Sequence, residues 1–202
     1  MCSNGIILAA DLFPICKKTV MESTVLSSYN DTAVVENSRL RIFFIESLKD
    51  IYYAEQHLVD ALETLRDEAT TTDLKRAFNE HRIITQGHVT RLQHVFSSIG
   101  EEPDTKKCQA IKGIISEADS IISDTENDTL TRDAALIMAA QKAEHYEIAT
   151  YGSLVQFANV LGERGAAELL EETLKEEKQA DAILTKIAES FINQSAGAEV
   201  DR

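Results

Sequence analysis

The sequence predicts an all-α protein: a four-helix bundle of two antiparallel hairpins, with a short extra helix between the second and third long helices. Three observations predict this fold class. Apolar residues recur at spacings of three and four through four long stretches of the chain, as on amphipathic helices. The 202 residues include only eight glycines and two prolines, too few for the frequent turns of an all-β protein. Short connections within each pair of long stretches favour antiparallel packing.

The first predicted hairpin lies in residues 39–99. Its first helix carries apolar residues at helical spacing from Leu40 to Leu65. Three threonines and an aspartate at 70–73 interrupt this pattern and supply N-cap side chains for a second helix over about 74–99. Gly100 then predicts the C-terminal stop of that helix.

A shorter helix and the second hairpin follow. Residues 108–122 carry isoleucines at helical spacing and predict the short helix, and the polar run 123–131 predicts a loop. Long helices follow over about 132–161 and about 166–191, separated by a turn that contains two glycines. The long connection between the hairpins allows the second hairpin to pack in a different order from a simple up-and-down chain.

Two segments outside the predicted bundle, which spans 39–192, lack a sustained helical period. Residues 1–38 predict a poorly ordered N-terminal extension, and residues 193–202 predict a flexible C-terminal tail. We do not interpret the apolar stretch 5–13 as a signal peptide, because no basic segment precedes it and lysines follow at 17 and 18. No stretch reaches the ~20 apolar residues that a membrane span needs.

Charge and cysteine content narrow the expected partners and location. With 20 basic and 34 acidic residues, the net charge is −14, which disfavours binding to nucleic acid and to anionic membrane surfaces. The three cysteines, Cys2, Cys16 and Cys108, are widely separated and odd in number. This pattern favours reduced thiols and a cytoplasmic location over a disulfide framework.

Several carboxylates and histidines share their helix face with leucine and isoleucine. A buried ionised carboxylate is costly unless it is paired or bound to a cation. Residues three or four positions apart lie on one side of a helix, so these side chains are predicted to point toward the interior. The candidates are Glu55, His81, His88, Glu144, Glu147, Glu177 and Asp181.

Two interpretations of these side chains stay open. One glutamate from each helix together with histidine is the ligand set of a carboxylate-bridged metal pair in a bundle, and such donors suit Fe or Mn. Alternatively, Lys142, Lys175 and Lys178 neutralise the acids through salt bridges, and the histidines have ordinary buried roles. The sequence contains no nucleophilic triad, glycine-rich phosphate loop or zinc spacing, and we interpret its tyrosines as packing residues.

Four stretches are more specific than helical periodicity: SLKDIYYAEQHL, AFNEHRIITQGHVTRLQHVF, DAALIMAAQKAEHYEIATYGSL and ELLEETLKEEKQAD. In this order and spacing, over about residues 40–188, the chain resembles the YciE/YciF family of bacterial stress-associated proteins. The resemblance implies a ferritin-like four-helix bundle, commonly a homodimer, with a dinuclear metal site between the helices. It also implies a role in stress responses, without an established reaction or substrate.

The motifs of that family fall on the inward residues. Its YxAE motif ends at Glu55, its HxxET motif begins at His81, its EHYE motif covers 144–147, and its EExxxD motif covers 176–181. The resemblance therefore implies metal ligands at Glu55, His81, Glu144, Glu147, Glu177 and Asp181.

The second helix departs from the family pattern. Ile84 stands where the HxxET motif has its glutamate, and His88 stands where glutamine is common. Two ions, one ion, a degenerate site and no metal all stay open, as does compensation by His88. The ExxH pair typical of ferritins is absent, so ferritin-type iron storage is not supported.

The leading hypothesis is a cytoplasmic, ferritin-like stress protein that forms a homodimer and binds one or two ions of Fe or Mn. The alternative is a non-enzymatic, acidic helical dimer that acts through protein interactions without metal, its inward carboxylates neutralised by lysine or protonated.

Overall fold

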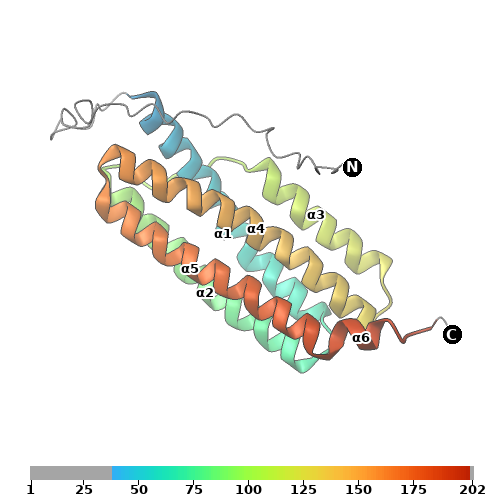
Figure 1. Cartoon of the computed structure of the whole chain (residues 1–202). Helices are drawn as coiled ribbons and strands as arrows, with labels where there is room; N and C mark the ends of the chain where they lie inside the picture. The colour runs from blue at the N-terminus through green and yellow to red at the C-terminus, as the bar shows by residue number, and fades with distance from the viewer. Residues whose placement is uncertain (1–37, 201–202) are drawn as a thin grey trace, which may run out of the picture. The chain divides into compact units, whose positions relative to one another are not determined.

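A computed structural model describes residues 38–200, which belong to one compact unit. Within this range every regular element is a helix, so the predicted all-α class is confirmed. The elements, coloured along the chain in Figure 1, are α1 (Arg39–Glu68), α2 (Thr72–Ser98), α3 (Gln109–Asp124), α4 (Leu130–Leu161), α5 (Arg164–Ile187), the π-helical η2 (Ala188–Ile192) and α6 (Asn193–Ala196).

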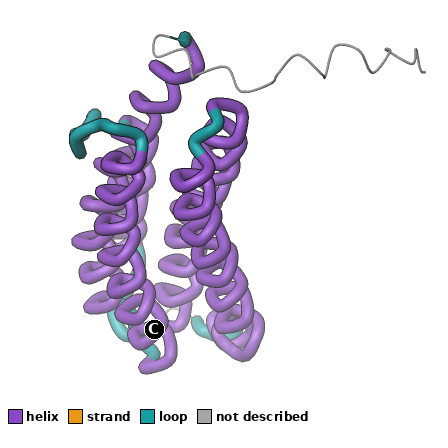
Figure 2. Tube along the Cα trace, turned by 90° about the vertical axis from the view of Figure 1, so that its left-hand side faces the viewer, coloured by secondary structure: helices purple, strands orange, loops and turns teal. Residues whose placement is uncertain are grey.

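The four long helices form two antiparallel hairpins, α1–α2 and α4–α5, with their loops at the two ends of the bundle (Figure 2). Arg41, near the start of α1, lies 2.8 Å from a carboxylate oxygen of Glu163 in the α4–α5 turn. At the opposite end, the Asp133 carboxylate near the start of α4 accepts hydrogen bonds from the backbone N–H groups of Thr70 and Thr71 at 2.6 and 2.9 Å. α4 therefore runs antiparallel to α1.

The helices pack in a ring. α1 contacts α2 and α4, and α5 contacts α2 and α4, so each long helix has two long neighbours. α3 lies outside this ring against α4 and α1. By returning the chain along the bundle, α3 places α4 beside α1 rather than beside α2, as the long connection allows.

The core contains two apolar clusters with a polar layer between them. One cluster includes Phe44, Leu48 and Leu92, and the other includes Phe78 and Leu184. On α2, the stretch 81–88 separates Phe78 of the second cluster from Leu92 of the first. The inward carboxylates and histidines occupy this intermediate layer.

Side-chain caps and glycines mark several helix ends, and Thr71 and Gly100 lie where the sequence predicts such signals. The Ser38 side chain accepts a hydrogen bond from the backbone N–H of Arg41, and the Thr71 side chain accepts one from that of Leu74. Gly100 and Gly162 follow α2 and α4 with φ of 76° and 79°, a left-handed conformation that glycine adopts without strain.

The C-terminal end differs from the predicted element boundaries. Regular α-helix in α5 ends at Ile187, and η2 continues it with Ile192 still buried. Residues 193–196 form α6, and the Glu199 carboxylate then accepts hydrogen bonds from the backbone N–H groups of Leu130 and Thr131 at 2.7 and 2.8 Å. These contacts attach the C-terminal segment to the start of α4.

The predicted extension, except for Ser38, lies outside the described residues. None of the described helices combines the length and hydropathy that crossing a membrane requires.

Candidate metal centre

The polar layer receives side chains from all four long helices. Positions seven apart on one helix lie two turns apart on the same face, which brings both α2 histidines inward. The six inward side chains, all buried, are Glu55 on α1, His81 and His88 on α2, Glu144 and Glu147 on α4, and Glu177 on α5.

Glu55, His88 and Glu177 form a first group of potential ligands. Nδ1 of His88 lies 2.8 Å from Oε1 of Glu177 and 3.5 Å from Oε1 of Glu55. One ligand atom from each of the three residues falls within 4.8 Å of the other two. All three residues are 0% exposed, so this group is closed to bulk water.

His81, Glu144 and Glu177 form a second group. Nε2 of His81 lies 3.1 Å from Oε1 of Glu144 and 3.6 Å from Oε2 of Glu177. Here too, one ligand atom per residue lies within 4.8 Å of the others. Each group thus offers two carboxylates and one imidazole.

Glu177 belongs to both groups through different oxygens. Its Oε1 faces His88, and its Oε2 faces His81. A carboxylate with one oxygen toward each of two ligand groups has the arrangement of a bridging ligand between two ions. The geometry therefore fits a paired centre, with Glu177 in the middle.

Many polar atoms of the centre lack hydrogen-bond partners. Both carboxylate oxygens of Glu177 are buried without a hydrogen bond, and so are Oε2 of Glu55 and Oε2 of Glu144. The same is true of Nδ1 of His81 and His88, so the short contact between His88 and Glu177 lacks hydrogen-bond geometry. Buried polar atoms without partners are costly, and coordination to a cation is one way to satisfy them.

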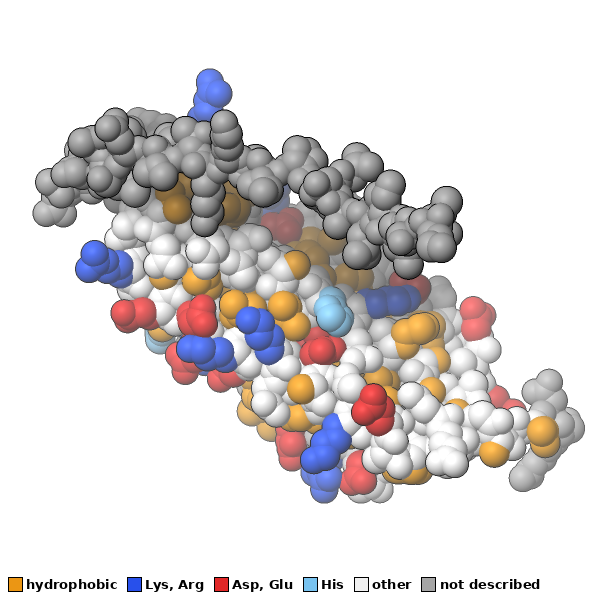
Figure 3. Space-filling model, viewed as in Figure 1, with side chains coloured by type: hydrophobic (Ala, Val, Ile, Leu, Met, Phe, Trp, Pro, Cys, Tyr) orange, Lys and Arg blue, Asp and Glu red, His pale blue; other side chains and the backbone are white. Residues whose placement is uncertain are grey.

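No lysine or arginine within residues 38–200 pairs with the four inward carboxylates. Lys142 pairs with Glu117, Lys175 pairs with Glu171, and Lys178 is exposed. On the face of the molecule in Figure 3, acidic and basic side chains are interspersed, unlike the acids of the buried layer. The predicted alternative of neutralisation by these three lysines therefore does not describe the centre.

Burial shifts the protonation of these groups. It raises the pKa of Glu144 to about 7 and raises that of Glu147 well above its ordinary value, with the charge of Glu177 adding to the second shift. Burial also raises the pKa of Glu55 and Glu177, although contact with His88 opposes the rise. Burial alone lowers the pKa of His88, but contacts with Glu177 and Glu55 raise it to about 10.

Two further residues support the ligand groups and were not predicted as site residues. The Tyr151 hydroxyl on α4 donates a short hydrogen bond to Oε1 of Glu55. Oε2 of Glu176 lies 2.9 Å from Nε2 of His88, and Arg91 lies 2.6 Å from the same oxygen. Tyr151 shares the predicted inner face of its helix, a signal of an inward role, and Glu176 is the first residue of the EExxxD motif.

The structure does not bring every predicted residue into the two groups. Glu147 is buried in the same layer but joins neither group. Asp181 lies at the edge, where Gln141 donates a hydrogen bond to Oδ1 at 3.0 Å and His145 lies 3.6 Å away. Ile84, which replaces a glutamate of the family motif, is 41% exposed and lies outside both groups.

Sequence comparison identifies the family to which this chain belongs. The sequence model of DUF892, described as a domain of unknown function, matches residues 39–197. The chain belongs to the DUF892 family. Protein YciF of Escherichia coli (strain K12) is 45% identical to this DUF892 chain over 157 residues, which are 76% of the chain and 92% of YciF. The resemblance to the YciE/YciF proteins is thereby confirmed.

Solved structures agree with the fold of the DUF892 chain. The crystal structure of the E. coli stress protein YciF matches with a TM-score of 0.73 at 44% identity, covering 77% of this chain and 98% of that one. YcfI from Rhodopseudomonas palustris matches with a TM-score of 0.71 at 37% identity, covering 73% and 94%. A protein from Xanthomonas campestris pv. campestris shares the fold with a TM-score of 0.62 at 20% identity, covering 80% and 98%.

Proposed function

We propose that this DUF892 chain is a metal-binding protein that holds two ions of Fe or Mn in the polar layer of its bundle. One observation carries the proposal: two groups of buried carboxylates and histidines share Glu177, and no lysine or arginine among residues 38–200 neutralises their acids. Two divalent cations would add positive charge to the acids of this layer, and the oxygens that have no hydrogen-bond partner would bind them.

The donor set favours Fe or Mn over softer metals. Carboxylate oxygens with one imidazole per group suit these ions, and neither ligand group contains a cysteine. When bound, such ions supply redox or Lewis-acid chemistry to a molecule beside them. The chain's own residues hold and orient the ligands: Tyr151 fixes Glu55, and Glu176 contacts the outer ring nitrogen of His88.

His88 compensates for Ile84 in this proposal. With Ile84 in place of glutamate, α2 provides no carboxylate to either group, but His88 gives the first group its nitrogen donor. The proposed ligands of the first ion are Glu55, His88 and Glu177. Those of the second are His81, Glu144 and Glu177, with Glu147 and Asp181 as outer groups.

The proposed cellular role is inferred from a matched relative. Because the matched crystal structure is that of a stress protein, we propose a cytoplasmic stress function for this chain, as a homodimer. Sedimentation analysis of the purified chain tests the dimer, and a monomer mass at micromolar concentration contradicts it. The alternative, an acidic helical dimer that acts without metal, is an outcome of the metal experiment below.

Metal analysis of protein purified without chelator tests the centre. We expect about two ions per wild-type chain, because the structure contains two ligand groups. Glu177→Gln removes the shared ligand and should lose both ions, whereas His88→Ala should lose about one. Glu63→Gln and His57→Ala, both at exposed positions on α1, are the matched controls and should retain wild-type metal content.

The opposite results are equally informative. Fewer than about 0.1 ions per wild-type chain, unchanged after incubation with Fe(II) or Mn(II), overturns the proposal and favours the metal-free alternative. Equal metal loss in Glu63→Gln and Glu177→Gln shows that the bound ions lie on the acidic surface and not in the bundle.

A further inference from the structure

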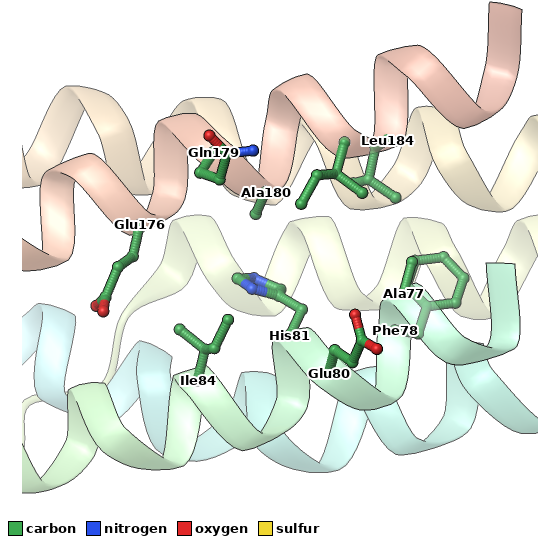
Figure 4. A pocket seen from close by; sticks show the side chains of 10 residues that line it. Ala77, Phe78, Glu80, His81, Ile84, Glu176, Gln179, Ala180 and Leu184 are labelled. Carbon is green, nitrogen blue, oxygen red and sulfur yellow. The ribbon is translucent and has the colours of Figure 1, made fainter. Parts of the chain in front are cut away.

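A pocket opens between α2 and α5 directly beside the proposed centre. Its volume is about 120 Å³, and His81 lies among its lining side chains (Figure 4). Ala77 on α2 and Ala180 on α5 are small, and the pocket lies between these two helices. The remaining walls are mainly aliphatic and aromatic: Phe78, Ile84, Ile183 and Leu184.

Exposed isoleucines from both helices line the pocket, together with the exposed Glu80 on α2 and Gln179 on α5. Ile84 is 41% exposed and Ile183 is 40% exposed, and both line the pocket. Where the family motif has a glutamate, this chain therefore presents an isoleucine to the entering molecule. A carboxylate at position 84 would draw water and cations to the mouth, whereas isoleucine favours apolar molecules.

The polar groups of the pocket disfavour anions. Glu80 and Glu176 line it together with Gln179, and the chain as a whole carries a net charge of −14. The imidazole of His81 lies among the lining side chains of the pocket. Nδ1 of His81 is buried without a hydrogen-bond partner, so the pocket reaches a residue with one unused polar atom.

His81 also connects this pocket with the interior. It lines a smaller cavity of about 30 Å³ together with Glu144 and Glu147, while its Nε2 faces the second ligand group. A molecule in the pocket would therefore lie beside His81, which is itself a proposed ligand of the second ion.

We propose that this pocket binds a small, uncharged and largely apolar molecule next to His81. A dry apolar cavity of roughly 150 Å³ is known to accept benzene or xenon, so a pocket of about 120 Å³ suits a molecule with about six heavy atoms. The further statement that this molecule is the substrate of the centre rests on the proposed metal function. Binding itself does not depend on metal.

A titration of the metal-free chain with benzene tests the pocket. With methyl-labelled isoleucine and leucine, we expect saturable shifts in the NMR signals of Ile84, Ile183 and Leu184, which line the pocket. Ile42 on α1 is 53% exposed and does not line it, so its signal should not shift. Benzoate, which has the same ring but a negative charge, should bind at least about tenfold more weakly, because the pocket desolvates the charge beside acidic residues.

Substitutions of residues that line the pocket distinguish binding in the pocket from non-specific hydrophobic binding elsewhere on the protein. Ala77→Leu fills the space from α2 and should weaken benzene binding about tenfold, and Ala180→Leu should do the same from α5. Ala182→Leu is the matched control, because Ala182 is exposed on α5 and does not line the pocket. The methyl spectra report directly whether each variant is folded.

Three results overturn the proposal: shifts that do not saturate, shifts of Ile42 as large as those of Ile84, or equal affinity of Ala77→Leu and wild type. Because the titration is made with chelator present, it is independent of the metal analysis. Benzene binding without metal binding leaves the pocket as a ligand site and removes the proposed function. Metal binding without benzene binding removes the pocket proposal alone.

Discussion

At the scale of single residues, Tyr151 connects packing with the chemistry of the centre. Its ring is fully buried in the first apolar cluster, and its hydroxyl donates a hydrogen bond to Glu55. A carboxylate at 0% exposure depends on such donors, because water does not reach it. Tyr151 therefore fixes the position of a proposed ligand as well as filling the core.

Tyr151→Phe removes this donor with little change in side-chain volume. We expect the free energy of unfolding of the metal-free chain to fall by about 1–3 kcal/mol, because an oxygen of Glu55 loses its partner in a buried site. Urea denaturation followed by circular dichroism measures the change. The control is Tyr53→Phe, at a half-buried position where the ring stacks on His57. Equal stabilities of the two variants would show that the Tyr151 hydroxyl contributes nothing.

Residue identity and helical phase predicted which side chains of the proposed centre lie inward. Glu55, His81, Glu144 and Glu177 lie inward, as their apolar neighbours on each helix indicate. Asp181 shows the limit of this reasoning. It follows Glu177 by one turn, but four residues exceed one helical period, and the structure turns its side chain toward Gln141 on α4. Its environment depends on the neighbouring helix, which periodicity within α5 does not contain.

At the scale of elements, the start of α4 is capped from a distant part of the chain. Glu199 accepts hydrogen bonds from the backbone N–H groups of Leu130 and Thr131 and from the Thr131 hydroxyl. These N–H groups have no partner within the first turn of a helix, and a negative charge there also interacts favourably with the helix dipole. The bonds from Thr131 and Leu130 lower the pKa of Glu199.

The lowered pKa predicts a pH dependence of stability. A carboxyl group whose pKa is lower in the folded state stabilises the fold above its unfolded value, near 4.5. That contribution is lost as the pH falls through the folded value. Glu199→Gln removes it, so the variant should be less stable than wild type at about pH 6 and nearly equal to it at about pH 3. Urea denaturation at both pH values measures this, and a difference that is the same at the two values contradicts the charged cap.

Element types were predictable from sequence because helix signals are local. Thr71, within the threonine run 70–72, caps α2, and the glycines at 100 and 162 follow α2 and α4. The tail was less predictable. Residues 193–200 are small and polar, and their attachment to α4 depends on Glu199, 68 positions from Thr131 in the sequence. Contacts at that separation leave no periodic pattern.

At the scale of the whole molecule, metal should stabilise the bundle. All four long helices contribute proposed ligands, which unfolding separates, so an ion that binds only the folded chain raises the free energy of unfolding. At a concentration of 100 times Kd, the expected gain is about 2.7 kcal/mol for one ion. Differential scanning calorimetry with and without Mn(II) measures the corresponding rise in Tm.

A variant of Glu177, the proposed ligand common to both groups, is the control for this stabilisation. Glu177→Gln should unfold at the same temperature with and without Mn(II), whereas Glu63→Gln should respond as wild type does. An unchanged Tm of the wild-type chain at saturating Mn(II) or Fe(II) would favour the protein that works without metal.

The polar layer between the two apolar clusters also bears on how the bundle opens. Each cluster has its own set of contacting side chains, and the layer between them holds acids that repel one another. In the metal-free chain we therefore expect local opening at one end of the bundle, so that amide hydrogens there exchange while the other end stays closed. Two metal ions bound in the polar layer would connect the two ends, so that the bundle opens as a single unit.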